Sequence, residues 1–184
     1  MTLYVGELQE LQVAGGQVLT RTSHCYHGGV RVGMRVAGVV YYLHADHLGS
    51  VTLTTDGDGE VVAQRLYRPY GETRYVTGTL TTEYGFTAQK EAAGIGLVYM
   101  HARWYDASLM RWISADPVVP QPASAQGWNR YVYGGANPLR FVDPTGRQVQ
   151  PPDYVRFGIQ HTGTTGAQVL SLGGLVSLSM VPAG

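Results

Sequence analysis

The stretch Val51–Tyr67 reads VTLTTDGDGEVVAQRLY. Apolar and hydroxyl-bearing residues alternate in its first part, two Asp-Gly pairs follow at 56–59, and an apolar run returns from Val61. Alternation with a period of two is typical of a half-buried strand, and Asp-Gly favours the tight turn between antiparallel strands. The stretch therefore predicts a β-hairpin.

The same pattern recurs along the chain and extends the prediction to the whole fold. Short apolar or alternating runs are separated by turns that contain Gly or Pro, and they lie at 17–26, 30–36, 39–44, 73–77, 97–105 and 109–114. Such spacing predicts a mainly β protein, a meander of antiparallel hairpins. A short helical turn is expected near 129–134 and a short strand at 139–142.

The composition fits this fold and excludes several functions. The chain has 184 residues, 25 Gly and 13 Tyr, and only 14% of its residues are charged. This excludes a disordered charged tail and a coiled coil. The 13 Lys and Arg balance the 13 Asp and Glu, so nucleic acid is not an expected partner. Every basic residue except Lys90 is Arg, which predicts guanidinium groups stacked on Tyr rings.

Two local features bear on compartment and redox chemistry. Cys25 is the only cysteine, which rules out an intrachain disulfide and predicts a small buried residue. Residues 2–7 lack the basic and apolar regions of a signal peptide, so an export signal would have to lie elsewhere.

Six motifs follow one another in order between residues 44 and 146. They are HADHLGS (44–50), YRPYGE (67–72), ARWYD (102–106), RWISADP (111–117), NRYVY (129–133) and NPLRFVDPTG (137–146). As a set they resemble the RHS repeat-associated core domain, the C-terminal end of RHS or YD-repeat proteins. The resemblance covers roughly residues 1–147.

This resemblance implies a division of the chain and a role. Residues 1–36 would be the last YD-type repeat units, 37–147 the core domain, and 148–184 a variable C-terminal segment, truncated or weakly structured. In full-length relatives such hairpins spiral into a hollow shell that encloses a C-terminal effector, often a toxin. The implied partners are an upstream YD-repeat shell, of the same or a neighbouring chain, and that effector. The implied location is secreted or at the cell surface, within a larger protein.

The resemblance also implies a possible reaction. Several relatives cut themselves once after an Asp-Pro-x-Gly-Leu motif as aspartyl proteases. Here Asp143 and Asp116 would be the catalytic pair, Arg130 would hold a carboxylate or polarise the scissile carbonyl, and Arg147–Gln148 would be the bond cut. Two carboxylates close together can activate water and protonate the leaving amine.

Other interpretations of these residues stay open. Asp-Pro-x-Gly is also a common turn, Arg147 stands where cleaving relatives have Leu, and the motif at Asp116 lacks Gly. A third hypothesis is a carbohydrate- or surface-binding module in which aromatic rings line the binding site. The competing interpretation is that these rings pack against one another across neighbouring strands. The rings concerned are those of Tyr99, Trp104, Tyr105 and Trp112.

No metal and no cofactor are expected. His44, Asp46 and His47 lie in a motif that we interpret as structural, and the loop that begins at Asp56 lacks the Gly and Glu of a calcium loop. The apolar residues 167–181 are too few to cross a bilayer but could associate with a membrane. A strip of hairpins without its neighbouring strands would leave edges unpaired, which predicts poor solubility.

Overall fold

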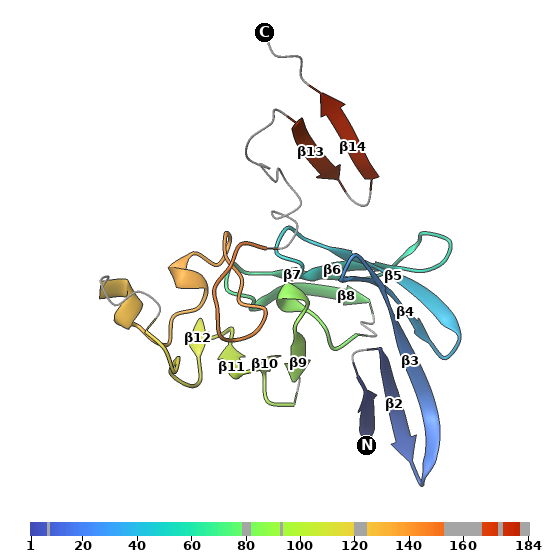
Figure 1. Cartoon of the computed structure of the whole chain (residues 1–184). Coiled ribbons are helices and arrows are strands. Elements are labelled where there is room, and N and C mark those ends of the chain that lie inside the picture. Colours follow the sequence, from blue (N-terminus) through green and yellow to red (C-terminus); the bar gives the residue numbers. More distant parts are fainter. Residues whose placement is uncertain are drawn as a thin grey trace.

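The computed structural model describes residues 1–6, 8–78, 82–92, 94–119 and 125–152, and the backbone of two later strands. Its main element is an eight-stranded sheet in which each strand pairs antiparallel with the next one along the chain (Figure 1). The strands are β1 (Thr2–Val5), β2 (Gln9–Ala14), β3 (Gln17–His27), β4 (Val30–Val36), β5 (Val39–Ala45), β6 (Val51–Thr55), β7 (Val61–Tyr67) and β8 (Thr73–Gly78). The predicted meander is confirmed.

The Asp-Gly turn forms as its sequence predicts. Asp56 Oδ1 accepts hydrogen bonds from the main-chain N–H of Asp58 at 3.0 Å and of Glu60 at 2.9 Å. Gly59 has a φ of +88°, a conformation that side chains with a Cβ rarely adopt. The turn thus joins β6 to β7 with its own carboxylate as the internal acceptor.

A smaller sheet has the strand order β12-β11-β10-β9. Its strands are β9 (Lys90–Ala92), β10 (Leu97–Met100), β11 (Arg103–Asp106) and β12 (Arg111–Trp112). The prediction of one strand over 97–105 was wrong, because the chain turns at His101, which has a φ of +54°. Ala102 N–H then leaves the ladder and donates to Thr145 O at 3.2 Å.

Two further local predictions need correction. The helical turns lie at the two ends of 129–134 and are 3-10 helices. η2 (Ala125–Trp128) ends just before this range, and η3 (Gly134–Ala136) begins at its last residue. Residues 139–142 form no strand, because Arg140 N–H and Phe141 N–H both donate to Asn137 O in a turn. Within this segment Val142 alone forms a β-bridge, to Gln150. A third 3-10 helix, η1 (Phe86–Ala88), lies between β8 and β9.

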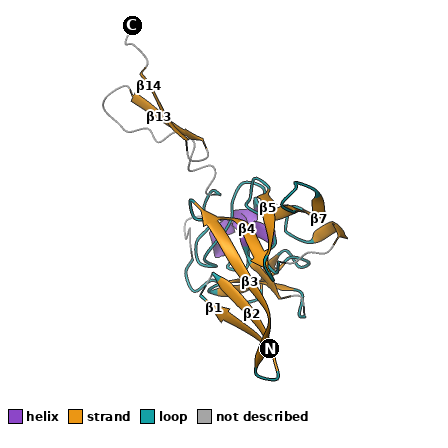
Figure 2. Ribbon diagram, turned by 90° about the vertical axis from the view of Figure 1, so that its right-hand side faces the viewer, coloured by secondary structure: helices purple, strands orange, loops and turns teal. Residues whose placement is uncertain are grey.

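Buried residues form two clusters. The larger one contains Leu48, Phe86, Val98, Met100, Tyr105, Trp112, Tyr133 and Val142. The smaller one, Met34, Leu43 and Val51, lies within the large sheet. Figure 2 shows the strands of that sheet as one twisted layer.

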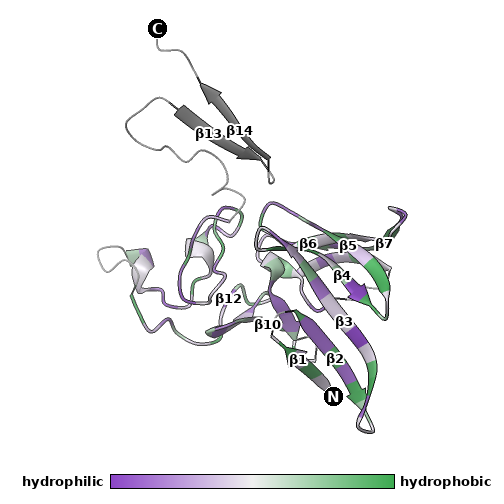
Figure 3. Ribbon diagram, turned by 45° about the vertical axis from the view of Figure 1, so that its right-hand side comes forward, coloured by the Kyte–Doolittle hydropathy of each residue, from purple (hydrophilic) through white to green (hydrophobic). Residues whose placement is uncertain are grey.

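Part of the large sheet lies open to solvent. Hydrophobic residues occur at the outer end of the β2–β3 hairpin (Figure 3), where Val18 and Leu19 are exposed. Cys25 is also exposed, so its predicted burial was wrong, because it lies on the face of β3 opposite to the buried His24. Strands β13 (Ala167–Leu172) and β14 (Leu175–Met180) pair with each other. The hypothesis that residues 167–181 associate with a membrane depends on their side chains, which lie outside the described part of the structure. No helix among the described residues is long and apolar enough to cross a membrane.

Candidate functional site

The floor of the site is a cluster of four buried aromatic rings. Tyr133 packs on Tyr105 with ring centroids 4.4 Å apart, and Trp112 lies 5.6 Å from Tyr105 and 5.7 Å from Tyr133. Phe86 completes the cluster at 6.0 Å from Tyr133. Burial raises the pKa of the Tyr105 and Tyr133 hydroxyls above its ordinary value. These phenols are therefore neutral under ordinary conditions.

Arg103 lies on this floor with its charged group buried. Residues 103 and 105 share one face of β11, so the strand that buries Tyr105 also buries Arg103. The guanidinium carbon lies 4.0 Å from the centre of the Trp112 ring, a cation–π contact. Only 5% of the Arg103 side chain is exposed, so its charge needs partners within the protein.

Those partners are the two predicted carboxylates. Arg103 Nη2 lies 3.0 Å from Asp116 Oδ2 and 3.2 Å from Asp143 Oδ2. The side chains of Asp116 and Asp143 are 9% and 0% exposed. Residues more than a dozen positions apart in the chain thus meet at one nitrogen atom, and we call Arg103, Asp116 and Asp143 the ion triad.

The second oxygen of each carboxylate binds main-chain N–H groups. Asp143 Oδ1 accepts from Arg147 N and Gln148 N, both at 3.0 Å, and Asp116 Oδ1 accepts from Val118 N at 2.9 Å. Each carboxylate therefore has one oxygen on the guanidinium and the other on the backbone. This arrangement satisfies two buried negative charges with one cation and several dipoles.

The turn that begins at Asp143 is held against β10 and β11. Arg103 Nε donates to Gly146 O, and Gln89 Nε2 donates to Pro144 O at 3.1 Å. Gly146 has a φ of +67°, and a Cβ there would lie 2.2 Å from Met100 O. Only glycine fits this position, so the last Gly of the motif is required by close packing.

The proposed scissile bond lies at the ion triad. The amide nitrogen of the Arg147–Gln148 bond is Gln148 N, the atom that donates to Asp143 Oδ1. The side chain of Arg147 is exposed and is absent from the contacts that hold the turn.

Arg130 contacts neither a carboxylate nor the carbonyl of the proposed scissile bond, the two partners that the resemblance implied, among the contacts that the structure describes. Its Nε donates to the main-chain carbonyl of Asp116, and Asp116 N donates to Arg130 O at 2.8 Å. Arg130 thus fixes the backbone that carries Asp116, and the cation that contacts both carboxylates is Arg103. Sequence reasoning missed Arg103, although it belongs to the ARWYD motif and alternates with Trp104.

The aromatic residues of the carbohydrate hypothesis separate into two groups. Tyr105 and Trp112 are 0% and 1% exposed and belong to the aromatic floor. Tyr99 and Trp104 are 39% and 37% exposed and pair across β10 and β11 with ring centroids 5.0 Å apart. The exposed pair has the cross-strand packing that was the alternative interpretation.

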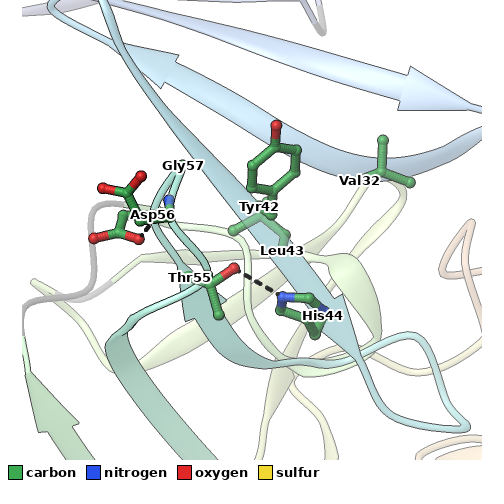
Figure 4. A pocket seen from close by; sticks show the side chains of 9 residues that line it. Val32, Tyr42, Leu43, His44, Thr55, Asp56 and Gly57 are labelled. Carbon is green, nitrogen blue, oxygen red and sulfur yellow. Dashed lines mark hydrogen bonds between the residues drawn. The ribbon is translucent and has the colours of Figure 1, made fainter.

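Among the described residues, two of the cavities away from the ion triad are candidates for further sites. One, of about 620 Å³, is an open hollow beside the Asp-Gly turn, where His44 Nε2 and Thr55 Oγ1 share a hydrogen bond of 3.0 Å (Figure 4). The Asp56 carboxylate at its rim is occupied by its own turn. The described residues contain no group of three or more side chains that could hold a metal ion.

The second cavity, of about 570 Å³, has Tyr4 and Arg31 of the large sheet and Tyr99 of the small sheet in its wall. Arg31 stacks over the Tyr84 ring at 3.3 Å, as the Arg-rich composition predicts. Pro144 and Pro152 also line this cavity, so the chain passes along its wall after the turn.

Comparison with known proteins decides the family. The model of the teneurin YD-shell matches residues 23–139, well over half of the chain. The chain belongs to the teneurin YD-shell family. The match includes Arg103 and Asp116 and ends shortly before Asp143.

Bacterial toxin components are among its relatives. Toxin subunit YenC2 of Yersinia entomophaga is 31% identical over 163 residues, which are 84% of this chain and 16% of that protein. Double-stranded DNA deaminase toxin A of Burkholderia cenocepacia is 30% identical over 142 residues, which are 70% of this chain and 10% of that protein. The chain thus spans less than a fifth of the length of either relative.

A solved structure confirms the fold. The crystal structure of TcdB2-TccC3-Cdc42 superposes with a TM-score of 0.65 at 23% identity, over 79% of this chain and 8% of that chain. At this identity the likeness concerns the fold. Together with the family match it gives this chain a structural role in a YD-type β-shell.

Proposed function

We propose that the chain is the end-piece of a YD-type shell that encloses or presents a C-terminal effector segment. The effector would act in bacterial competition or at a cell surface, and the assembly would be secreted or surface-exposed. The observation that supports this most is the turn at Asp143, which is anchored on the ion triad and is followed by Pro152 in the wall of a cavity that both sheets line. Residues 1–36, 37–147 and 148–184 would be the last repeats, the core and the variable segment.

Enclosure predicts protection from proteases. Arg156 is a trypsin site in the proposed effector segment, and Arg140, which precedes Phe141, is a trypsin site in an exposed turn. In the chain joined to upstream YD-repeat strands, we expect cleavage at Arg156 to be at least tenfold slower than in the chain alone. Cleavage by trypsin is followed by mass spectrometry, with Arg140 as the reference site. Equal rates at Arg156 in the two proteins would contradict enclosure.

A second candidate function is a single self-cleavage at Arg147–Gln148. It is favoured by the hydrogen bond between Gln148 N and Asp143 Oδ1 and by the convergence of both carboxylates on Arg103. Unlike a pair that shares a proton, these carboxylates are bridged by a guanidinium. The reaction needs a proton on one carboxyl of the ion triad, which then serves as the donor to the leaving amine.

The reaction would use the two carboxylates in different roles. Asp116 takes a proton from water as the water oxygen bonds to the carbonyl carbon of Arg147. The bond between that carbon and Gln148 N then breaks while protonated Asp143 gives its proton to the nitrogen. The products are a carboxyl group on Arg147 and an amine on Gln148. Because the substrate is part of the same chain, its effective concentration is high and a slow step suffices.

A further inference from the structure

The residues just after the Arg147–Gln148 bond are held by the domain on the other side of that bond. Val142 N donates to Gln150 O at 2.9 Å, and Gln150 N donates to Val142 O at 2.8 Å. This is a closed pair of antiparallel hydrogen bonds, the same unit that joins strands within a sheet. Gln148 N adds a third bond, to Asp143 Oδ1.

The segment ends in a buried side chain. Pro152 is buried and lines the cavity that Val142 and Pro144 also line. Val142 itself is 4% exposed and belongs to the main hydrophobic cluster, so the bridge is formed against a fixed wall. Two successive prolines, Pro151 and Pro152, restrict the backbone of the segment and lower the entropy lost on holding it.

We propose that residues 148–152 are a non-covalent anchor that keeps the C-terminal segment bound to the core domain after the Arg147–Gln148 bond is cut. The inference extends the proposed self-cleavage, since an anchor matters only once that bond is broken. Cutting the bond removes neither the Gln150 bridge nor the buried Pro152. Cleavage then changes the covalent state of the effector segment without releasing it.

The anchor can be tested with an engineered cut, so the test does not need self-cleavage. A recognition sequence for a site-specific protease is inserted between Arg147 and Gln148 in the full chain, and an affinity tag follows Gly184. Intact mass before protease addition reports any spontaneous cut separately. After complete cutting, the core that remains with the tagged piece is followed over time under native washing.

Gln150→Pro removes the N–H that donates to Val142 O, whereas Gln150→Ala keeps the main-chain bridge and serves as the matched control. We expect the cut chain and Gln150→Ala to stay associated, and Gln150→Pro to dissociate at least tenfold faster. Pro152→Ser, which keeps every main-chain donor of the bridge, is expected to accelerate dissociation as well. Dissociation of the unsubstituted cut chain as fast as Gln150→Pro would overturn the anchor, as would equal retention of all four proteins.

Discussion

Replacing Arg103 with Met is expected to lower the free energy of unfolding by about 3–5 kcal/mol, because it leaves two buried carboxylates without their cation. Asp116 and Asp143 are 7% and 1% exposed as residues and lie on the same guanidinium nitrogen. Met fills much of the Arg volume, so the loss reflects charge rather than a cavity. Urea denaturation in dilute solution, followed by tryptophan fluorescence, measures the change.

The triple variant Arg103→Met, Asp116→Asn, Asp143→Asn is the matched control. It removes the cation and both negative charges together, and we expect it to regain a large part of the lost stability. Lys in place of Arg103 keeps the charge but loses the planar contacts to Trp112 and Gly146 O, so it should lie between the two. A single Arg103→Met variant as stable as the unsubstituted chain would show that the ion triad does not hold this end of the fold.

Asp143→Asn is expected to abolish self-cleavage at Arg147–Gln148 completely. Asn keeps an oxygen that accepts from the Arg147 and Gln148 amides but cannot donate the proton that the leaving amine needs. The Asn –NH2 group would replace the oxygen that accepts from Arg103 Nη2, so this one hydrogen bond is lost. Arg103 still pairs with Asp116, so the buried charges remain balanced and we expect the fold to persist. Intact mass and a denaturing gel, at mildly acidic and neutral pH, detect a break after Arg147.

The outcomes of this experiment are distinct. A chain without substitutions that stays whole under both conditions rejects the enzymatic hypothesis. A chain that cuts itself and still does so as Asp143→Asn excludes Asp143 as the proton donor. Asp58→Asn, in an exposed turn far along the chain from the motif, should cut like the unsubstituted protein.

The sequence was sufficient for the hairpins but not for their junctions. Alternation and Asp-Gly predicted β6, β7 and the turn between them, because period and turn chemistry are local properties. The break at His101 was not predictable in this way. It depends on Ala102 bonding to Thr145, a residue 43 positions later. Residues 139–142 differ, because the bonds to Asn137 O that replace a strand there are local.

The site shows the same limit. Asp116 and Asp143 were found because each precedes Pro in a recognisable motif. Arg103 was missed because burial of a charge depends on tertiary partners that local alternation does not reveal. Arg130 was assigned to a carboxylate or to the scissile carbonyl, and in the structure it contacts a main-chain carbonyl of the Asp116 segment. The order of the motifs was thus sufficient to locate Asp116 and Asp143, but the contacts of Arg103 and Arg130 became known only from the structure.

The central claim is that this chain is one part of a larger sheet, and its free edge tests it directly. In the described part of the chain no strand pairs with the outer edge of β1, where Leu3 and Val5 are 40% and 54% exposed. Such an edge is a template for pairing with another strand. Light scattering after size exclusion measures whether the chain associates.

We expect the chain alone to be poorly soluble and to associate. Leu3→Lys should reduce this association, whereas Leu109→Lys, which changes an exposed residue in a turn, should not. Joining the preceding shell strands to β1 should reduce association more than Leu3→Lys does. A soluble monomer of the unsubstituted chain that melts cooperatively would contradict the account.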